Sequence, residues 1–226
     1  FNADTPRGVF IVRQNEGLEV AVLEYLQGVY PARDKDFVLS MSETDVVVIR
    51  EFASAADPSV LEQTAIQMQS SIENDIGVHC VVGVGSPVNH LRELADRYKE
   101  AQTAIEVSRV FDTEKTVMCY DSLGIGRIIY QLPTTLCEMF LAEVFKKNPI
   151  ESLDQETLYT INKFFENNLN VSETSRKLFV HRNTLVYRLE KIKKLTGLDL
   201  REFDHAIVFK VALMVKKYLD TQNIRY

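Results

Sequence analysis

The chain has 226 residues, of which 46% are hydrophobic and 26% are charged, and its formal net charge is −6. A chain of this length and composition folds as one or two soluble domains with a sizeable core. No apolar run approaches the roughly 18 residues that a membrane-spanning helix needs. We therefore expect a cytoplasmic protein with no membrane span and no signal peptide. The start at Phe1 rather than at methionine fits either a trimmed or a processed form.

The charge is distributed unevenly along the chain. Residues 1–151 carry 13 basic and 23 acidic side chains, a net charge of −10. Residues 152–226 carry 13 basic and 9 acidic side chains, a net charge of +4. An acidic body joined to a basic C-terminal module is typical of a regulator whose binding surface lies at one end.

The first half of the chain alternates between strand and helix patterns. Apolar runs predict strands at residues 8–13, 37–41, 46–50, 79–84 and 117–120. Helical periodicity predicts helices at residues 18–29, 58–75 and 88–110. Pro58 suits the first turn of the second helix, and Gly77 suits its C-terminal cap. The first six elements follow the order strand, helix, strand, strand, helix, strand, which is that of a ferredoxin-like or cyclase-like α/β domain.

Two small motifs in this half have structural rather than catalytic interpretations. The Gly-Val-Gly run at residues 83–85 lacks the full pattern of a phosphate-binding loop. We expect its glycines to let the chain turn from the fourth strand towards the next helix. Cys80, Cys119 and Cys137 form no C-x-x-C pair, which predicts reduced thiols that pack as small hydrophobic side chains. The four histidines are scattered, and we expect neither a metal site nor a cofactor.

The second half of the chain is predicted to be all α-helical. A helical connector at residues 121–147, broken at Pro133, has apolar side chains that must pack on the α/β body or on a second subunit. Ser152, with Gln155 three residues later, forms a capping-box pattern at the start of the next helix. The last helix, residues 204–219, is apolar on nearly every side, so it is either the core of a small domain or part of a dimer contact. The predicted architecture is α+β, with an α/β domain at residues 1–122, a helical connector at 123–149 and an all-α domain at 150–226.

Residues 170–197 have the layout of a DNA-binding helix-turn-helix. A short helix at residues 172–178, a tight turn and a longer helix at residues 182–195 follow one another. From residue 176 to residue 194 there are seven basic side chains and one acidic one, a net charge of +6. A solvated basic helix would have the same charge, but here charge, turn spacing and amphipathic phase coincide, which favours a DNA-binding surface.

The two sides of the longer helix differ in chemistry. One side is an apolar stripe at helical period, formed by Leu185, Leu189, Ile192 and Leu195. The opposite side carries Asn183, Tyr187, Glu190 and Lys194. The stripe is predicted to hold the helix against the core, and the polar side to present hydrogen-bonding groups to base edges.

The predicted DNA-binding residues form two groups. Recognition helices usually contact bases with their N-terminal residues, which here are Arg182, Asn183, Thr184 and Tyr187. The other predicted contacts are to phosphates, which fix the register on DNA, and they come from Arg176, Lys177, Arg188, Lys191 and Lys194. Asn183 can pair with adenine, and Arg182 with guanine or a phosphate. The alternative for Thr184 is helix capping, and for Tyr187 it is partial packing.

The run RKLFVHRNTLVYRLEKIKKLTGLDL, at residues 176–200, resembles the C-terminal helix-turn-helix of the PucR family, which includes CdaR-type regulators of sugar diacids. Residues 178–185 also resemble the Fis-type motif L-G-[IV]-x-R-x-T-L. The resemblance covers most of residues 152–220. One difference is Phe179, where the motif prefers glycine. A phenylalanine with a positive φ is strained, so either the turn differs slightly or the Phe179 side chain is tucked into the core.

The α/β body is similar to the degenerate GGDEF-type domain of CdaR-like members of that family. The similarity is carried by the element order and by the run VVGVGSPVNHLRELADRYKEAQTAIEVSRVF at residues 81–111. An active diguanylate cyclase has two glycines and a metal-binding acid in its central hairpin. Here that hairpin is Ser-Glu-Thr-Asp-Val at residues 42–46, and the first strand has no obvious metal-binding aspartate. We expect a domain without catalysis that serves regulation or dimerisation, and binding of a ligand without turnover stays open.

The resemblance implies a bacterial transcriptional regulator that binds operator double-stranded DNA and is not an enzyme. One helix-turn-helix gives little affinity, so we expect a homodimer or higher oligomer. Full-length relatives carry an N-terminal ligand-sensing region, so a small-molecule effector would be sensed by a region absent from this chain. The alternative is a nucleotide- or small-ligand-sensing α/β protein whose C-terminal helices are a protein-interaction module. Turnover of GTP with Mg²⁺ or Mn²⁺ would favour that alternative.

Overall fold

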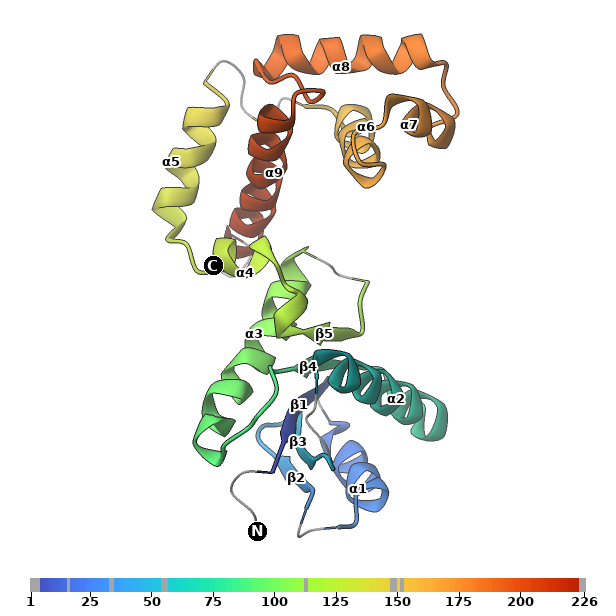
Figure 1. The fold of residues 1–226 in the computed structure, drawn as a ribbon, viewed down its shortest axis with the longest axis vertical. Coiled ribbons are helices and arrows are strands. Elements are labelled where there is room, and N and C mark those ends of the chain that lie inside the picture. Colours follow the sequence, from blue (N-terminus) through green and yellow to red (C-terminus); the bar gives the residue numbers. More distant parts are fainter. Residues whose placement is uncertain are drawn as a thin grey trace. The chain divides into compact units, whose positions relative to one another are not determined.

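Figure 1 shows the computed structural model of the chain, which describes residues 5–15, 17–32, 35–53, 57–111, 114–146, 150 and 153–223. The chain forms two compact units, Phe1–Tyr130 and Gln131–Tyr226. The helical connector expected at residues 123–149 is divided between these units. Its expected end at residue 149 lies outside the described residues, so the three-part division of the chain stays a prediction.

The N-terminal unit contains a five-stranded sheet in the order β2-β3-β1-β4-β5. Its strands are β1 (Arg7–Gln14), β2 (Phe37–Ser40), β3 (Asp45–Glu51), β4 (Cys80–Val84) and β5 (Val117–Cys119). Strand β1 pairs antiparallel with β3 and β4, β2 pairs antiparallel with β3, and β5 pairs parallel with β4. The first four strands have the arrangement of a ferredoxin-like domain, which confirms the expected fold class of this unit.

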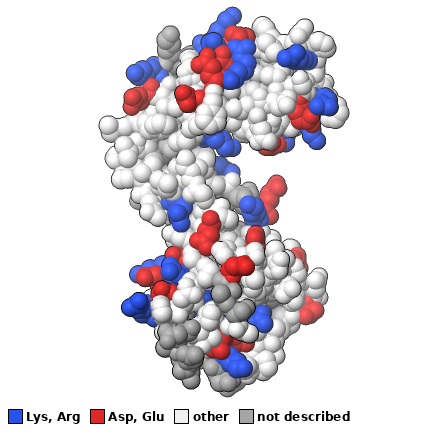
Figure 2. All heavy atoms as spheres, viewed as in Figure 1, with Lys and Arg blue, Asp and Glu red and all other residues white. Residues whose placement is uncertain are grey.

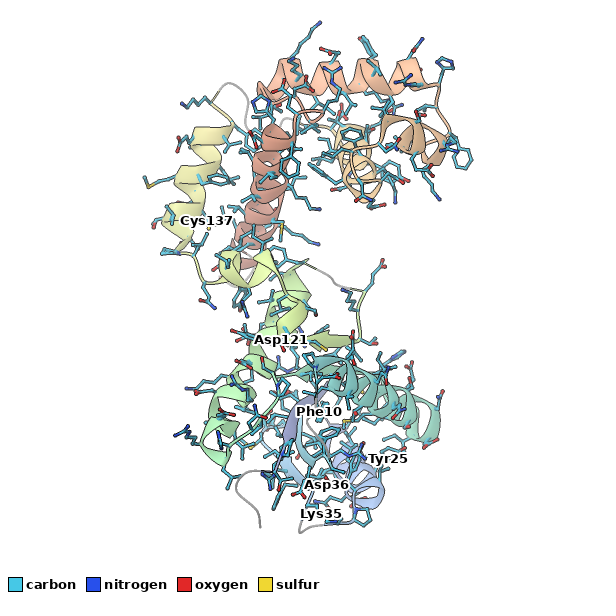
Figure 3. The ribbon with its side chains drawn as sticks, viewed as in Figure 1. Phe10, Tyr25, Lys35, Asp36, Asp121 and Cys137 are labelled. Carbon is cyan, nitrogen blue, oxygen red and sulfur yellow. The ribbon has the colours of Figure 1, made fainter. Side chains whose placement is uncertain are left out.

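Helices cover both faces of this sheet. The helices of the unit are α1 (Glu19–Val29), α2 (Pro58–Ile76), η1 (Leu91–Glu93), α3 (Leu94–Phe111), η2 (Tyr120–Ser122) and α4 (Ile125–Tyr130). Phe10 and Val12 of β1 pack in the core formed with α1 and α2, whereas Val9 and Ile11 pack in the core formed with α3 (Figures 1 and 3). Successive side chains of a strand point to opposite faces, so a continuous apolar run is what a sheet covered on both faces requires.

The third long helix begins later than residue 88, where the sequence pattern placed its start. The backbone N–H of Arg7 donates to the carbonyl oxygen of Val88 at 2.9 Å, and the N–H of Val88 donates to that of Arg7 at 2.8 Å. Val88 is therefore held in a β-bridge and cannot be the first residue of a helix. Helix α3 starts at Leu94, after the short helix η1.

The two glycines of the Gly-Val-Gly run let α3 approach the sheet closely. A Cβ atom at Gly83 would overlap the backbone oxygen of Ala101, and one at Gly85 would overlap the backbone of Arg97. Both glycines therefore serve close strand–helix packing, whereas the sequence pattern suggested a turn. The expected glycine cap of α2 is confirmed, because Gly77 has a φ of 67° at the C-terminal end of that helix.

The three cysteines are free and buried. Burial raises the pKa of the Cys80 thiol to about 12 and that of Cys119 to about 11. Cys137 lies on the side of its helix that faces α9 (Figure 3). Thiols with raised pKa values carry little thiolate at neutral pH, which agrees with the expected role as small hydrophobic side chains.

The C-terminal unit is all α-helical. Its helices are α5 (Thr134–Val144), α6 (Gln155–Glu166), α7 (Val171–Lys177), α8 (Arg182–Thr196) and α9 (Phe203–Asn223). Helix α9 supplies Phe209 and Ala212 to the core of this unit, which confirms the first of the two roles predicted for it, whereas a dimer contact stays a prediction. Asp154 caps α6 by accepting the N–H of Thr157 at 2.7 Å, and the predicted cap, Ser152, lies outside the described residues. Among the described residues, no helix has both the length and the apolar character required to cross a bilayer.

Candidate nucleic-acid interface

Helices α7 and α8 form the predicted helix-turn-helix. Asn170 caps α7 by accepting the N–H of Glu173 at 3.0 Å. His181 caps α8, since its Nδ1 atom accepts the N–H of Asn183 at 3.2 Å. The alternative of helix capping for Thr184 is therefore wrong. Gly197, with a φ of 81°, ends α8 in the left-handed conformation that glycine adopts without strain.

Three residues of the predicted apolar stripe of α8 are buried, and the fourth, Leu195, is half-buried. Leu185, Leu189 and Ile192 are at most 1% exposed, and they pack in one core with Phe164 of α6 and Phe209 of α9. Burying three such side chains contributes on the order of 5 kcal/mol of transfer free energy. This core fixes the rotation of α8 about its own axis, and so decides which side chains face the solvent.

The predicted base-contacting residues lie on the exposed side of α8. Arg182, Asn183 and Thr184 in its first turn are all exposed. Tyr187 is 72% exposed, so partial packing, the alternative for this residue, accounts for little of its surface. These four side chains are brought together at the N-terminal half of α8, where recognition helices usually contact bases.

Three of the five predicted phosphate contacts are engaged by carboxylates of their own domain. The Arg188 guanidinium contacts Glu156 of α6 at 2.5 Å and donates to the hydroxyl of Thr160 at 3.2 Å. Lys191 lies 3.6 Å from Asp154, and Arg176 lies 2.5 Å from Glu173. In the part of the chain that the structure describes, Lys177, Arg182 and Lys194 have no ion pair of this kind.

These ion pairs change the electrostatic picture of the domain. The net charge of +6 predicted for residues 176–194 ignores carboxylates supplied by α6 and by the segment after α8. Figure 2 shows basic side chains interspersed with acidic ones over this unit, and no continuous basic patch on the face in view. A phosphate that approaches Arg188 or Lys191 must compete with Glu156 or Asp154.

A shallow groove runs between α6 and α8. It is lined by Glu156, Thr157, Thr160, Thr184, Tyr187, Arg188, Lys191 and Ile192. The groove contains two predicted base contacts, Thr184 and Tyr187, and two cations, Arg188 and Lys191, whose carboxylate partners lie at the start of α6. Glu156 and Asp154 were not predicted to belong to this surface. They are about 30 residues from α8 in the sequence, and no sequence pattern indicates a contact over that separation.

The C-terminal end of α8 is held by a buried carboxylate. Asp199 is 4% exposed, and its oxygens accept from the Nε and Nη2 atoms of Arg201 at 2.8 and 2.7 Å and from Lys193 at 3.0 Å. These donors hold the pKa of Asp199 far below its usual range. Arg201 also contacts Glu190, so Glu190, which the sequence placed on the outer face, belongs to this structural cluster.

Phe179, in the turn between α7 and α8, has a φ of 54° and is 95% exposed. The turn therefore keeps the left-handed conformation that the Fis-type motif assigns to glycine. Both predicted possibilities, a turn that differs and a Phe179 side chain tucked into the core, are therefore wrong.

The hairpin of the N-terminal unit has two acids, of which Glu43 is exposed and Asp45 is buried in an ion pair. Asp45 is bound by Arg13, whose Nε and Nη2 atoms donate to its two carboxylate oxygens at 2.7 Å each. The N–H of Met41 donates to the carbonyl oxygen of Asp45 at 2.9 Å and closes the turn. Among the described residues, no group of three or more His, Cys, Asp or Glu side chains is placed to hold a metal ion. Asp45 thus serves a structural ion pair with β1.

Two protein-family models match the chain. Residues 157–215 match the PucR C-terminal helix-turn-helix domain, and residues 1–107 match the GGDEF-like domain. The chain therefore contains a PucR-type helix-turn-helix domain and a GGDEF-like domain. The first match contains α7, α8 and most of α9, and the second contains the four-stranded part of the sheet with α1, α2 and most of α3. Both expected domain types are therefore confirmed.

Several proteins similar to this chain are regulators by name. The chain is 24% identical over 162 residues to the purine catabolism regulatory protein of Bacillus subtilis, which covers 71% of the chain and 30% of the relative. It is 26% identical over 211 residues to the proline-responsive transcriptional activator PutR of the same organism, covering 89% of the chain and 50% of the relative. It is 27% identical over 221 residues to the carbohydrate diacid regulator of Escherichia coli, covering 93% of the chain and 57% of the relative. The chain thus spans about a third to somewhat over half of the length of these relatives.

Proposed function

We propose that this chain is the DNA-binding part of a bacterial transcriptional regulator of the PucR family and binds operator duplex DNA through α7 and α8. The observation that carries the proposal is the outer side of α8, where Arg182, Asn183, Thr184 and Tyr187 are exposed together on a helix fixed by its buried stripe. These side chains supply the donors and acceptors that read base edges in a major groove.

The proposed binding mode has two stages. Lys177 and Lys194 meet phosphates first, because their charges are not held by the ion pairs described above. Arg176, Arg188 and Lys191 then exchange a carboxylate for a phosphate as the surfaces close. Phosphate contacts position the helix and carry no sequence information, so Asn183 and Arg182 supply the preference for particular bases.

Four further properties belong to the same proposal. The protein acts as a homodimer or higher oligomer, since one helix-turn-helix gives little affinity. It works in the cytoplasm, where its DNA is. A small-molecule effector is sensed by a region outside this chain, and the GGDEF-like domain contributes to regulation or dimerisation without turning over a nucleotide. Incubation with GTP and Mg²⁺ or Mn²⁺ tests the last point, and formation of a cyclic product would contradict it.

The decisive experiment is selection of binding sites from a random-sequence duplex library by the purified chain at two salt concentrations. We expect enrichment of one defined site, arranged as a two-fold or tandem repeat, and weaker binding at the higher salt. Asn183→Ala serves as the control and is expected to enrich a site that has lost its preference at one base position. Absence of binding to any duplex, even at low salt, would overturn the proposal in favour of a protein-interaction module.

Replacing Glu156 with glutamine is expected to strengthen DNA binding. The change removes the carboxylate that holds Arg188 and leaves the side-chain size nearly unchanged. Arg188 then contacts its phosphate without first giving up a carboxylate partner, so the affinity for any duplex should rise about three- to five-fold. The number of phosphate contacts is the same, so the salt slope should stay nearly unchanged. Fluorescence anisotropy titrations at several salt concentrations measure both quantities.

Glu166→Gln is the matched control, since Glu166 is also an ion-paired carboxylate of α6 but contacts Lys163, which lies outside the predicted site. Its affinity for DNA should equal that of the unaltered chain. Equal effects of the two substitutions would show that only the total charge matters, and would refute a specific competition at Arg188.

A further inference from the structure

Phe179 combines two features that each cost free energy. Its φ of 54° lies in the left-handed region, which costs a residue with a side chain about 1–2 kcal/mol relative to glycine. Its ring is 95% exposed, so burial returns almost nothing. The backbone around it is well defined, because the N–H of Phe179 donates to Arg176 at 3.1 Å and the N–H of Val180 donates to Ser175 at 3.0 Å.

Folding of the helix-turn-helix does not explain this residue. Glycine would adopt the same turn without strain, and removal of an exposed ring would leave no cavity. Val180, the next residue, is half-buried and packs against the core, so the turn has its apolar anchor without Phe179. The ring is therefore available for a contact outside the domain.

The surroundings of Phe179 indicate what that contact is. The exposed side chains nearest in sequence on either side are Arg176, Lys177, His181 and Arg182, and none of them is acidic. If the ring entered an apolar pocket of a protein partner, these four basic or titratable side chains would lie at the rim of that pocket and would need acidic partners there. A polyanion with apolar surfaces contacts the ring and neutralises the cations at the same time. Duplex DNA has this combination, since deoxyribose carbons and thymine methyl groups lie between phosphates.

We infer that Phe179 is an apolar DNA-contact residue, which packs its ring on sugar carbons or a thymine methyl group beside the bases read by the start of α8. The inference rests on the proposed function and adds to it a residue outside the recognition helix. Phe179 precedes Arg182 by three residues, a span of at most about 11 Å along the chain. The ring therefore reaches positions within about three base pairs of those that Arg182 contacts, which makes it able to extend the recognised site.

The test uses Phe179→Gly in the complete chain, with the site enriched from the random library as the probe. Affinity for that site is expected to fall about ten-fold through loss of the apolar contact. The salt slope should stay unchanged, because no charge is lost. The midpoint of thermal unfolding should stay the same or rise, because glycine relieves the strain at a positive φ. Phe203→Ala, at another exposed phenylalanine (70%) of the same unit, should leave affinity unchanged.

Each other outcome overturns the inference. An affinity equal to that of the unaltered chain would place the contact of the ring elsewhere, on a protein partner. A lowered unfolding midpoint, or an equal loss of affinity in Phe203→Ala, would assign the effect to folding or to general surface hydrophobicity. Failure of the unaltered chain to bind any duplex would instead defeat the proposed function itself, and is recognisable without either variant.

Discussion

Asn183→Ala is expected to weaken binding to the preferred DNA site by about 1–3 kcal/mol and to relax the preference at one base position. Asn183 lies in the first turn of α8 and is exposed, and its amide can donate and accept on one adenine edge. Loss of this amide removes a base-specific contact and leaves the net charge of the surface unchanged. Library selection with the variant measures the relaxed position, and titration of the selected site measures the loss of affinity.

Lys194→Ala is the matched comparison for this prediction. Lys194 is exposed on the same helix and is predicted to contact a phosphate, so its loss should weaken binding to all sequences alike. The slope of log affinity against log salt should fall by about one. If both variants had the same sequence-independent effect, the division into base-contacting and phosphate-contacting residues would be wrong.

Asp199→Asn is expected to lower the free energy of unfolding of the C-terminal unit by about 2 kcal/mol at pH 7, through loss of charge-assisted hydrogen bonds. Arg201 and Lys193 both donate to the buried Asp199 carboxylate, and their exposed parts can be hydrated when it is lost. The pKa of Asp199 is lowered on folding, so its stabilisation is complete above the pKa of about 4 that it has in the unfolded chain and is lost as the pH falls towards the folded-state value. The difference between the two proteins should therefore be constant above about pH 5 and shrink as the pH falls below about 4.

Chemical denaturation followed by circular dichroism at several pH values measures this difference. Asp220→Asn is the control, because Asp220 pairs with Lys216 on the surface of α9 and such a pair contributes little. A pH-independent difference between Asp199→Asn and the unaltered chain would show that Asp199 acts by shape or packing rather than by its charge.

The two carboxylates at the start of α6, Asp154 and Glu156, are expected to limit the affinity of this domain for DNA. Glu156 and Asp154 hold Arg188 and Lys191 in defined positions in the absence of DNA, at the cost of competing with phosphate. Strong non-specific binding would retain a regulator on random DNA, so weaker phosphate contacts favour discrimination among sites. The predicted gain in affinity of Glu156→Gln for every duplex would then come with a lower ratio of specific to non-specific binding.

Local patterns determined the greater part of this architecture. The apolar run of β1 and the spacing of Leu185, Leu189 and Ile192 report burial directly, because a strand alternates its faces and a helix repeats every 3.6 residues. The order of strands and helices predicted the ferredoxin-like unit, and the residues of the turn and of α8 predicted a PucR-type helix-turn-helix. These features depend only on residues that are close together in the sequence, so they can be predicted from a single sequence.

The tertiary structure alone decided which side chains are free to act. Arg188 and Glu156 are 32 residues apart, and no spacing rule connects residues on different helices, so the ion pair that occupies a predicted phosphate contact was invisible in the sequence. The same holds for the bridge that delays the start of α3 and for the helix backbone that requires Gly83. Phe179 is the clearest example. An apolar residue at this position suggested a side chain packed in the core, but the turn directs the ring away from the core and leaves it exposed.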